Sequence, residues 1–181
     1  MCWNDDGLEL RFSAEDDPYL ANVYRKCNDP LFRQEVVEMF MAKGDAAPIW
    51  YTETELAPTG AVFVARIYHP ERNGVMTNSS YLDCDLVSFQ VSRETGDWNG
   101  VVHWPWRAFP DGVTGHVSSN VPKVLRGNLF RIRADVDIGE NSCETALDGT
   151  QCDFLAWSPT MASPPSFHWP TKFGTFFLKE K

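Results

Sequence analysis

The sequence predicts an all-β protein with an antiparallel β-sandwich fold, and three observations support this prediction. Short stretches alternate apolar and polar residues and are rich in β-branched or aromatic side chains, which is typical of half-buried strands. Helical periodicity is nearly absent, and turn residues separate the stretches. About nine strands at this spacing favour a sandwich with jelly-roll or immunoglobulin-like layering over a barrel or an α/β sheet.

The first half of the chain contains four of these stretches. Leu8, Leu10 and Phe12 point to one face of the first expected strand, and the polar residues between them point to the other. The other three expected strands of this half are Val37–Met41, Trp50–Leu56 and Ala61–Tyr68. A turn at Ala57–Gly60 joins the last two into a hairpin.

The second half adds five stretches of the same kind, separated by Gly- and Pro-containing turns. They are Leu86–Ser92, Trp98–Trp104, Asn128–Asp137, Phe154–Trp157 and Phe173–Lys179. Between two of them, Pro105–Phe109 is expected to form a short helical turn, because Pro is tolerated at the first helical position.

Length and composition indicate one globular domain over residues 1–181. Aromatic residues make up 13% of the chain, which excludes a disordered tail. Uninterrupted apolar runs are far shorter than the roughly 20 residues needed to cross a bilayer, so no membrane-spanning segment is expected. The net charge of −9 disfavours nucleic acid as a partner, since such affinity comes largely from Lys and Arg.

The five cysteines leave the redox state open. Cys143 and Cys152 flank a short polar turn, and either a disulfide or two free thiols fits that spacing. Because five is an odd number, at least one of Cys2, Cys27 and Cys84 is unpaired within this chain. The opening residues lack the charged and apolar regions of an export signal, whereas Asn78-Ser79-Ser80 fits the N-glycosylation pattern.

Known catalytic motifs are missing from the sequence. There is no nucleophile elbow, P-loop, dinucleotide-binding turn or zinc spacing. Glu35 and Glu38 cannot form a facing acid–base pair, because a three-residue offset on a strand places them on opposite faces. No metal centre of His and Cys is expected, because the four histidines are scattered: His69, His103, His116 and His168.

Aromatic and polar residues together are more informative. A neutral sugar offers C–H faces that stack on aromatic rings and hydroxyl groups that exchange hydrogen bonds with polar side chains. Loop aromatics and strand-borne polar residues supply both kinds of contact: Phe32, Phe167, Trp169, Glu38, Glu55, Arg131 and Arg133. The alternative is that these aromatic rings only cover the ends of the core.

Several segments, in this order, resemble the family 9 carbohydrate-binding modules, within the wider DOMON-like group of β-sandwiches. They extend from Trp3 to Leu178 and are Trp3–Leu10, Val37–Phe40, the Tyr-x-Glu-x-Glu strand near Tyr51, Trp157-Ser158 and Lys172–Gly174. The resemblance implies a sandwich that grips the end of a glucan or xylan chain between two aromatic rings at its tip.

The resemblance also assigns roles by motif position. The two clamp tryptophans of the family fall on Phe32 and Phe167, and its sugar-binding glutamate falls on Glu38. Arg133 lies near a position where the family has glutamine, and Pro164 and Pro165 lie where it has asparagine. These departures mean that the sugar specificity of the family is not transferred to this chain.

The family further implies features at the start of the chain and in its loops. Its members open with a strand that precedes the one at Leu8, so we expect this chain to lack an N-terminal strand and, if truncated, to derive from a secreted or extracellular protein. Three loops are rich in acidic residues: Asp5-Asp6, Glu15–Asp17 and Asp83–Asp85. We expect their side chains to be solvated, and the alternative is that they bind structural calcium, as the resembled modules do. No other cofactor is expected.

The leading hypothesis is a monomeric, non-catalytic domain that binds an oligo- or polysaccharide and is associated with carbohydrate catabolism. Phe32 and Phe167 stack on the sugar and Glu38 binds hydroxyl groups. Glu55, Arg133 and Trp169 assist.

Three alternatives remain. One is an electron-transfer domain whose haem is held by histidine and by Met39, Met41, Met76 or Met161. Another is a module of a glycoside hydrolase, linked to hydrolysis of O-glycosyl bonds by association and without expected intrinsic activity. The third is a protein–protein interaction module.

Overall fold

A computed structural model describes residues 1–15, 19–74, 78–94, 96–134, 142–143 and 152–179. Within these residues the chain forms eleven strands and four short 3₁₀ helices, which confirms the all-β prediction. The strands are β1 (Cys2–Trp3), β2 (Gly7–Ala14), β3 (Val36–Lys43), β4 (Trp50–Leu56), β5 (Val62–Tyr68), β6 (Asn78–Tyr81), β7 (Ser88–Glu94), β8 (Asp97–Pro105), β9 (Val124–Ala134), β10 (Cys152–Ala156) and β11 (Gly174–Phe177). The helices are η1 (Leu31–Arg33), η2 (Cys84–Leu86), η3 (Trp106–Ala108) and η5 (Pro170–Lys172).

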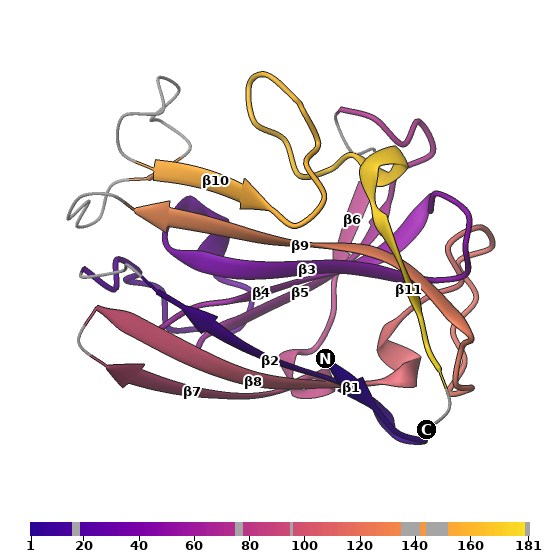
Figure 1. Cartoon of the computed structure of the whole chain (residues 1–181), viewed down its shortest axis with the longest axis horizontal. Coiled ribbons are helices and arrows are strands. Elements are labelled where there is room, and N and C mark those ends of the chain that lie inside the picture. The colour runs from indigo at the N-terminus through magenta and orange to yellow at the C-terminus, as the bar shows by residue number, and fades with distance from the viewer. Residues whose placement is uncertain (16–18, 75–77, 95, 135–141, 144–151, 180–181) are drawn as a thin grey trace.

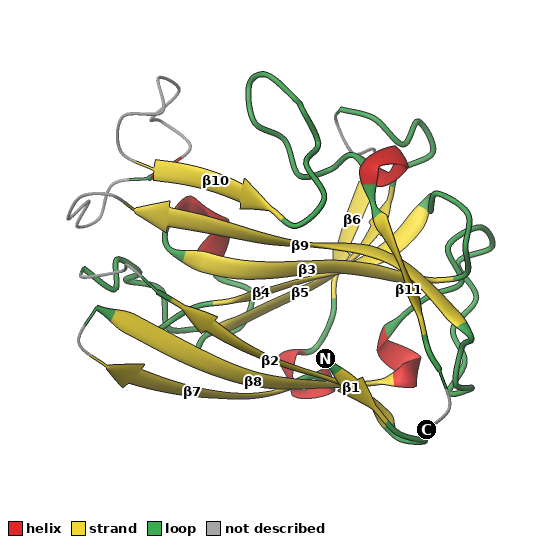
Figure 2. Cartoon of the chain, viewed as in Figure 1, coloured by secondary structure: helices red, strands yellow, loops and turns green. Residues whose placement is uncertain are grey.

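Two antiparallel sheets form the predicted sandwich. The smaller sheet has the order β1-β2-β8-β7, and the larger has the order β10-β9-β3-β4-β5-β6, with β11 also paired to β9. Figures 1 and 2 show the two layers, with β2, β7 and β8 below β3, β9 and β10. In the described part of the chain, no helix is long and apolar enough to cross a lipid bilayer.

The nine strands expected from the alternation all form. β4 has the expected bounds and the others have shifted ends, and the helical turn expected at Pro105–Phe109 is η3. The strand expected over Asn128–Asp137 starts earlier, as β9, and its last expected residues lie outside the described ones. The alternation did not predict β1 or β6. All four residues of β6 are exposed, so burial leaves no pattern there for sequence analysis to detect.

Side chains of the larger sheet pack on both of its faces. On β3, Met39 and Met41 point between the sheets, where they join a core that includes Trp104. Phe40 points to the outer face, where it joins a second cluster that includes Phe130. Burial on both faces explains why all eight residues of β3 are buried. The outer face is the one that carries the candidate site.

A buried carboxylate connects the two sheets at the start of β3. One oxygen of Glu35 accepts hydrogen bonds from Trp98 Nε1 of β8, at 3.1 Å, and from Arg131 Nε of β9, at 2.9 Å. The Glu35 side chain is fully buried, and that of Arg131 is largely buried. The backbone N–H of Glu35 donates to Ala21, and its carbonyl accepts from the Asn22 side chain. These contacts fix where β3 begins.

Two disulfides are present, Cys27–Cys84 and Cys143–Cys152. The second joins the two cysteines that the sequence placed around a turn, whose residues 144–151 lie outside the described ones. Cys2 is exposed and has no disulfide partner in the described chain. The odd cysteine is therefore Cys2.

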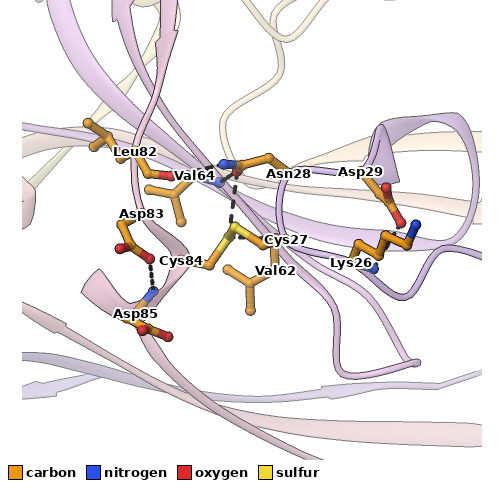
Figure 3. The surroundings of a disulfide bond; sticks show 10 residues. All are labelled: Lys26, Cys27, Asn28, Asp29, Val62, Val64, Leu82, Asp83, Cys84 and Asp85. Atoms are coloured by element: carbon orange, nitrogen blue, oxygen red, sulfur yellow. Dashed lines mark hydrogen bonds between the residues drawn. A yellow bond between two sulfur atoms is a disulfide. The ribbon is translucent and has the colours of Figure 1, made fainter.

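Cys27–Cys84 attaches the segment before η1 to the segment that follows β6, as Figure 3 shows. Beside it, Asn28 Oδ1 accepts from the N–H of Val64 at 2.8 Å, and Asn28 Nδ2 donates to the carbonyl of Leu82 at 2.9 Å. The loop that carries η1 is thus held to the segment after β6 by a covalent bond and to β5 by a hydrogen bond.

Replacing Glu35 with Ala should lower the free energy of unfolding by about 3–5 kcal/mol, because the Arg131 guanidinium would stay buried without its carboxylate. Chemical denaturation measures the loss. The matched control is Glu9→Ala: Glu9 pairs with Arg11 at the same 2.9 Å, but Arg11 is largely exposed, so little change is expected. Equal losses in both variants would contradict the structural role given to Glu35.

Replacing both Cys27 and Cys84 with Ser should lower the free energy of unfolding by about 2–4 kcal/mol, because the bond closes a long loop and restricts the unfolded chain. Cys2→Ser is the control and should leave stability unchanged, since Cys2 is exposed and free. A double variant as stable as the control would show that the disulfide contributes nothing to stability.

Candidate functional site

A pocket of about 440 Å³ lies on the outer face of the larger sheet, a volume typical of small-molecule sites. Residues of four strands form its floor: Glu38, Phe40, Glu53, Glu55, Phe63 and Ile132. Residues of η1, β6, β10 and the loop before η5 form its walls: Phe32, Ser79, Tyr81, Phe154 and Pro165 to His168. The loop between β10 and η5 lies above β9 in Figure 1, away from the smaller sheet.

Strand geometry brings three glutamates together on the floor. Glu53 and Glu55 are two residues apart on β4 and therefore share a face. Glu38 of β3 lies directly opposite Glu55 in the antiparallel register, which places their Cβ atoms about 5 Å apart. The result is a group of three carboxyl groups on two neighbouring strands.

Burial makes these carboxyl groups hard to ionise. Desolvation raises the pKa of Glu38 and of Glu55 well above the ordinary value, and repulsion from neighbouring glutamates adds to the effect. Burial raises the pKa of Glu53 to about 8, although its hydrogen bond with Glu55 opposes the shift. At neutral pH the group therefore holds protons, and its side chains are able to donate as well as accept hydrogen bonds.

Two carboxyl oxygens on the floor have no protein partner. Glu55 Oε2 accepts from the backbone N–H of Phe32 at 2.8 Å, so η1 is tied to the carboxyl group. Glu55 Oε1 and Glu38 Oε1 are buried and have no hydrogen-bond partner among the described residues. Among the buried polar atoms without a described partner, these two belong to residues that line the pocket, and a bound molecule could supply the hydrogen bonds that they lack.

His168 connects the loop to the floor. Its Nδ1 lies 2.7 Å from the hydroxyl of Tyr51, and its Nε2 lies 3.7 Å from Glu53 Oε1. Burial lowers the pKa of His168 to about 4 and raises that of Tyr51, so both are uncharged at neutral pH. The phenol and the imidazole share a hydrogen bond whose direction depends on the histidine tautomer, and the other ring nitrogen faces Glu53.

Aromatic rings line the pocket around the carboxyl groups. Phe167 stacks on Phe130 with a centroid separation of 4.2 Å and an interplanar angle of 13°, and Phe154 meets it edge-on at 6.1 Å. One face of Phe167 is thus covered, and only the other remains for a ligand. At η1, the guanidinium of Arg33 lies 5.9 Å from the centroid of Phe32.

The structure brings four of the predicted site residues to one pocket, namely Phe32, Glu38, Glu55 and Phe167. Arg133 does not line it. Neighbouring residues alternate along β9, so Arg133 faces away from the side of Ile132 and pairs with Asp153 of β10.

Trp169 does not line the pocket either. It precedes η5, where its backbone N–H donates to the Phe167 carbonyl at 2.7 Å.

Sequence reasoning missed Glu53, His168 and Tyr81. Glu53 had a usable signal, because the alternation that put Glu55 on one face of the strand put Glu53 on the same face. His168 and Tyr81 had no such signal in the sequence, because His168 reaches the pocket from a loop and Tyr81 from an exposed edge strand.

The described residues do not fit the calcium or haem expectations. No group of three or more His, Cys, Asp or Glu side chains in the described ranges is arranged to hold a metal ion. Asp83 accepts from the N–H of Asp85, and Asp16 and Asp17 lie outside those ranges.

For a haem held by Met and His, Met39 and Met41 lie between the sheets, on the face of β3 opposite the pocket that His168 lines. Met161 is exposed, and Met76 lies outside the described residues. None of the described methionines therefore lines the pocket with His168.

Comparison with curated proteins finds distant relatives, and no protein-family model matches the chain. Over 140 residues the chain is 35% identical to a protein of Arthroderma benhamiae named "Extracellular protein", covering 72% of this chain and 60% of the relative. Over 120 residues it is 28% identical to the "UPF0462 protein C4orf33 homolog" of Danio rerio, covering 59% and 56%. The chain thus spans about 60% of the length of these relatives.

Solved structures show where else this fold occurs. A Bacteroides uniformis protein inferred to bind carbohydrate superposes with a TM-score of 0.60 and 17% identity over 93% of this chain and 72% of that one. A family 9 carbohydrate-binding module from Caldicellulosiruptor kristjanssonii superposes with a TM-score of 0.57 in its complexes with cellotriose and with glucose. The sequence identity is 14% for the cellotriose complex and 13% for the glucose complex. Each superposition covers 99% of this chain, and the two cover 72% and 74% of the module's chain, respectively. The chain has the fold of these proteins.

The raised pKa of Glu53 predicts that stability falls as pH rises from 6.5 to 8. The folded state keeps a proton that the unfolded state has lost, and each such proton gives a slope of about 1.4 kcal/mol per pH unit. The lowered pKa of His168 makes stability rise with pH, but only below the ordinary histidine pKa of 6.5. Over this window, Glu53→Gln should therefore gain stability relative to the native chain, as measured by urea unfolding at several pH values.

The exposed carboxylate Glu71 provides the control, Glu71→Gln, which should keep the pH dependence of the native chain. If Glu53→Gln shows the same dependence as well, Glu53 does not hold its proton in the folded state.

Proposed function

We propose that the chain is a single domain over residues 1–181 that binds an oligo- or polysaccharide in the pocket, without catalysing a reaction. The observation that carries the proposal is the combination of aromatic walls with two buried carboxyl oxygens that have no hydrogen-bond partner among the described residues. Aromatic rings suit the C–H faces of a sugar, and the oxygens suit its hydroxyl groups.

In this proposal Phe32 and the free face of Phe167 stack on a sugar ring. Glu38 and Glu55 accept hydrogen bonds from its hydroxyl groups through their unpartnered oxygens. Arg133 and Trp169 are left out, since neither lines the pocket. Stacking of this kind contributes about 1 kcal/mol per ring, so the expected affinity is modest, on the order of micromolar to millimolar.

The solved structures with this fold support the substrate class. The module from Caldicellulosiruptor kristjanssonii is in complex with cellotriose and with glucose. We extend this to the present chain as a proposal: a plant-type glucan or xylan, recognised as part of carbohydrate catabolism. Membership of the family 9 modules, and of the DOMON-like group, remains a prediction from the sequence motifs.

A binding role fits the carboxyl groups better than hydrolysis does. Glycosidases place two carboxyl groups on either side of the scissile bond. Here Glu38, Glu53 and Glu55 project to the same side from neighbouring strands, and the exposed fractions of Glu38 and Glu55 are 1% and 0%. They form a floor rather than a flanking pair.

We further propose that the protein works in an oxidising, extracellular compartment. Its two disulfides are of a kind that persists in such compartments. The name of the Arthroderma benhamiae relative agrees with this assignment.

Replacing Phe32 or Phe167 with Ala should weaken binding to cello- or xylo-oligosaccharides by about fivefold each, the equivalent of one lost stacking contact. Isothermal titration calorimetry measures the change. Phe177→Ala is the control, because Phe177 is a largely exposed ring of β11 outside the pocket. Unchanged binding in both pocket variants would remove the aromatic clamp from the proposal.

A further inference from the structure

The pocket is lined by three acidic side chains and by no basic one among the described Lys and Arg residues. Its charged or titratable lining groups are Glu38 from β3, Glu53 and Glu55 from β4, Tyr81 from β6 and His168 from the loop before η5. Neither β5 nor β9 contributes a titratable group, and no described Lys or Arg lines the pocket. Arg33, which lies against Phe32, is exposed and outside the lining.

His168 does not neutralise the carboxyl groups. Its Nε2 is 3.7 Å from Glu53, yet burial lowers its pKa to about 4, so it faces them as a neutral group. Tyr51, which hydrogen-bonds to the far side of its ring, is also neutral. The described lining therefore offers no positively charged side chain to these three carboxyl groups, and burial keeps them protonated in the absence of one.

The buried oxygens show where such a partner would bind. Glu38 Oε1 and Glu55 Oε1 have no hydrogen-bond partner in the part of the chain that the structure describes, and they come from residues that face each other across β3 and β4. An ammonium group has three N–H donors and no acceptor, so it can satisfy both oxygens and ionise the carboxyl groups.

The surrounding rings also favour a cation. Phe32, Phe63, Tyr81, Phe154 and Phe167 line the same pocket. The faces of aromatic rings attract an ammonium group, and the attraction is stronger when the group is desolvated. A metal ion has less support, since no described group of carboxyl, His or Cys side chains has the arrangement to hold one.

We infer that the ligand of this pocket is an amino sugar, a glucosamine-containing saccharide whose protonated amine contacts Glu38 and Glu55 while its ring lies between the aromatic walls. This inference rests on the proposed carbohydrate-binding function and narrows its substrate class. Binding of the ammonium group also displaces protons from the glutamic acids into solution.

Calorimetry with three disaccharides of the same linkage tests the inference: cellobiose, the glucosamine disaccharide of chitosan, and its N-acetylated form. At about pH 5.5 the free amine is protonated, and we expect the glucosamine disaccharide to bind at least about tenfold more tightly than the other two. Titrations in two buffers of different ionisation enthalpy should also detect protons released by this ligand and not by cellobiose.

Three variants identify the groups responsible. Glu38→Gln and Glu55→Gln should each lower affinity for the glucosamine disaccharide by about tenfold or more, because a neutral amide cannot form an ion pair with the ammonium group. The control Glu71→Gln makes the same substitution at an exposed site outside the pocket and should have no effect. The comparison of ligands on the native chain needs no variant, so a misfolded variant leaves the test intact.

The outcomes separate the two proposals. If cellobiose binds as tightly as the glucosamine disaccharide, or more tightly, the amino-sugar inference is wrong and carbohydrate binding stands. If none of these sugars nor longer cello- and xylo-oligosaccharides bind, both fail. Selective binding of the amine with no loss in the two glutamine variants would overturn the assignment to Glu38 and Glu55.

Discussion

The hydrogen bonds of Glu35 are the constraint on which the site depends. The carboxylate lies between the two sheets and binds a tryptophan of one and an arginine of the other. It therefore sets the distance between the layers at this end of the sandwich and the residue at which β3 begins. Since side chains alternate along a strand, a shift of one residue would turn Glu38 and Phe40 into the inter-sheet core and Met39 out of it. A largely buried ion pair outside the pocket thus determines which side chains reach it.

The larger sheet serves two purposes because both of its faces are covered. One face closes the sandwich with aliphatic and aromatic side chains, and the other carries a second cluster in which carboxyl groups lie among aromatic rings. Burial that would destabilise isolated charges is tolerated here, because the raised pKa values let the glutamates remain partly protonated. The pocket can therefore form hydrogen bonds with a ligand, but its buried carboxyl groups destabilise the folded protein more as the pH rises.

Alternation within each strand made most of the fold predictable, including the hairpin of β4 and β5 and the strands of both layers. The same rule also places Glu53 on the face of Glu55, and it places Arg133 on the face opposite Ile132. The family motif alone does not give either placement. It could not find β6, which buries no side chain, nor pair Cys27 with Cys84, whose separation of 57 residues leaves no local signal. His168 and Phe154 join the site through the path of a late segment, and that path follows from packing against the outer face rather than from local sequence.

The disulfide between Cys27 and Cys84 divides the pocket into parts with different freedom to change. The covalent loop that it closes contains Phe32, Ser79, Tyr81, Phe63 and all three glutamates, and the opposite wall, from Phe154 to His168, lies outside it. Sequence change in that outer wall leaves the cross-linked part intact. Mutations that change ligand preference can therefore accumulate in the segment between β10 and η5. We expect divergent relatives to vary most there and to keep the strands within the loop that the disulfide closes.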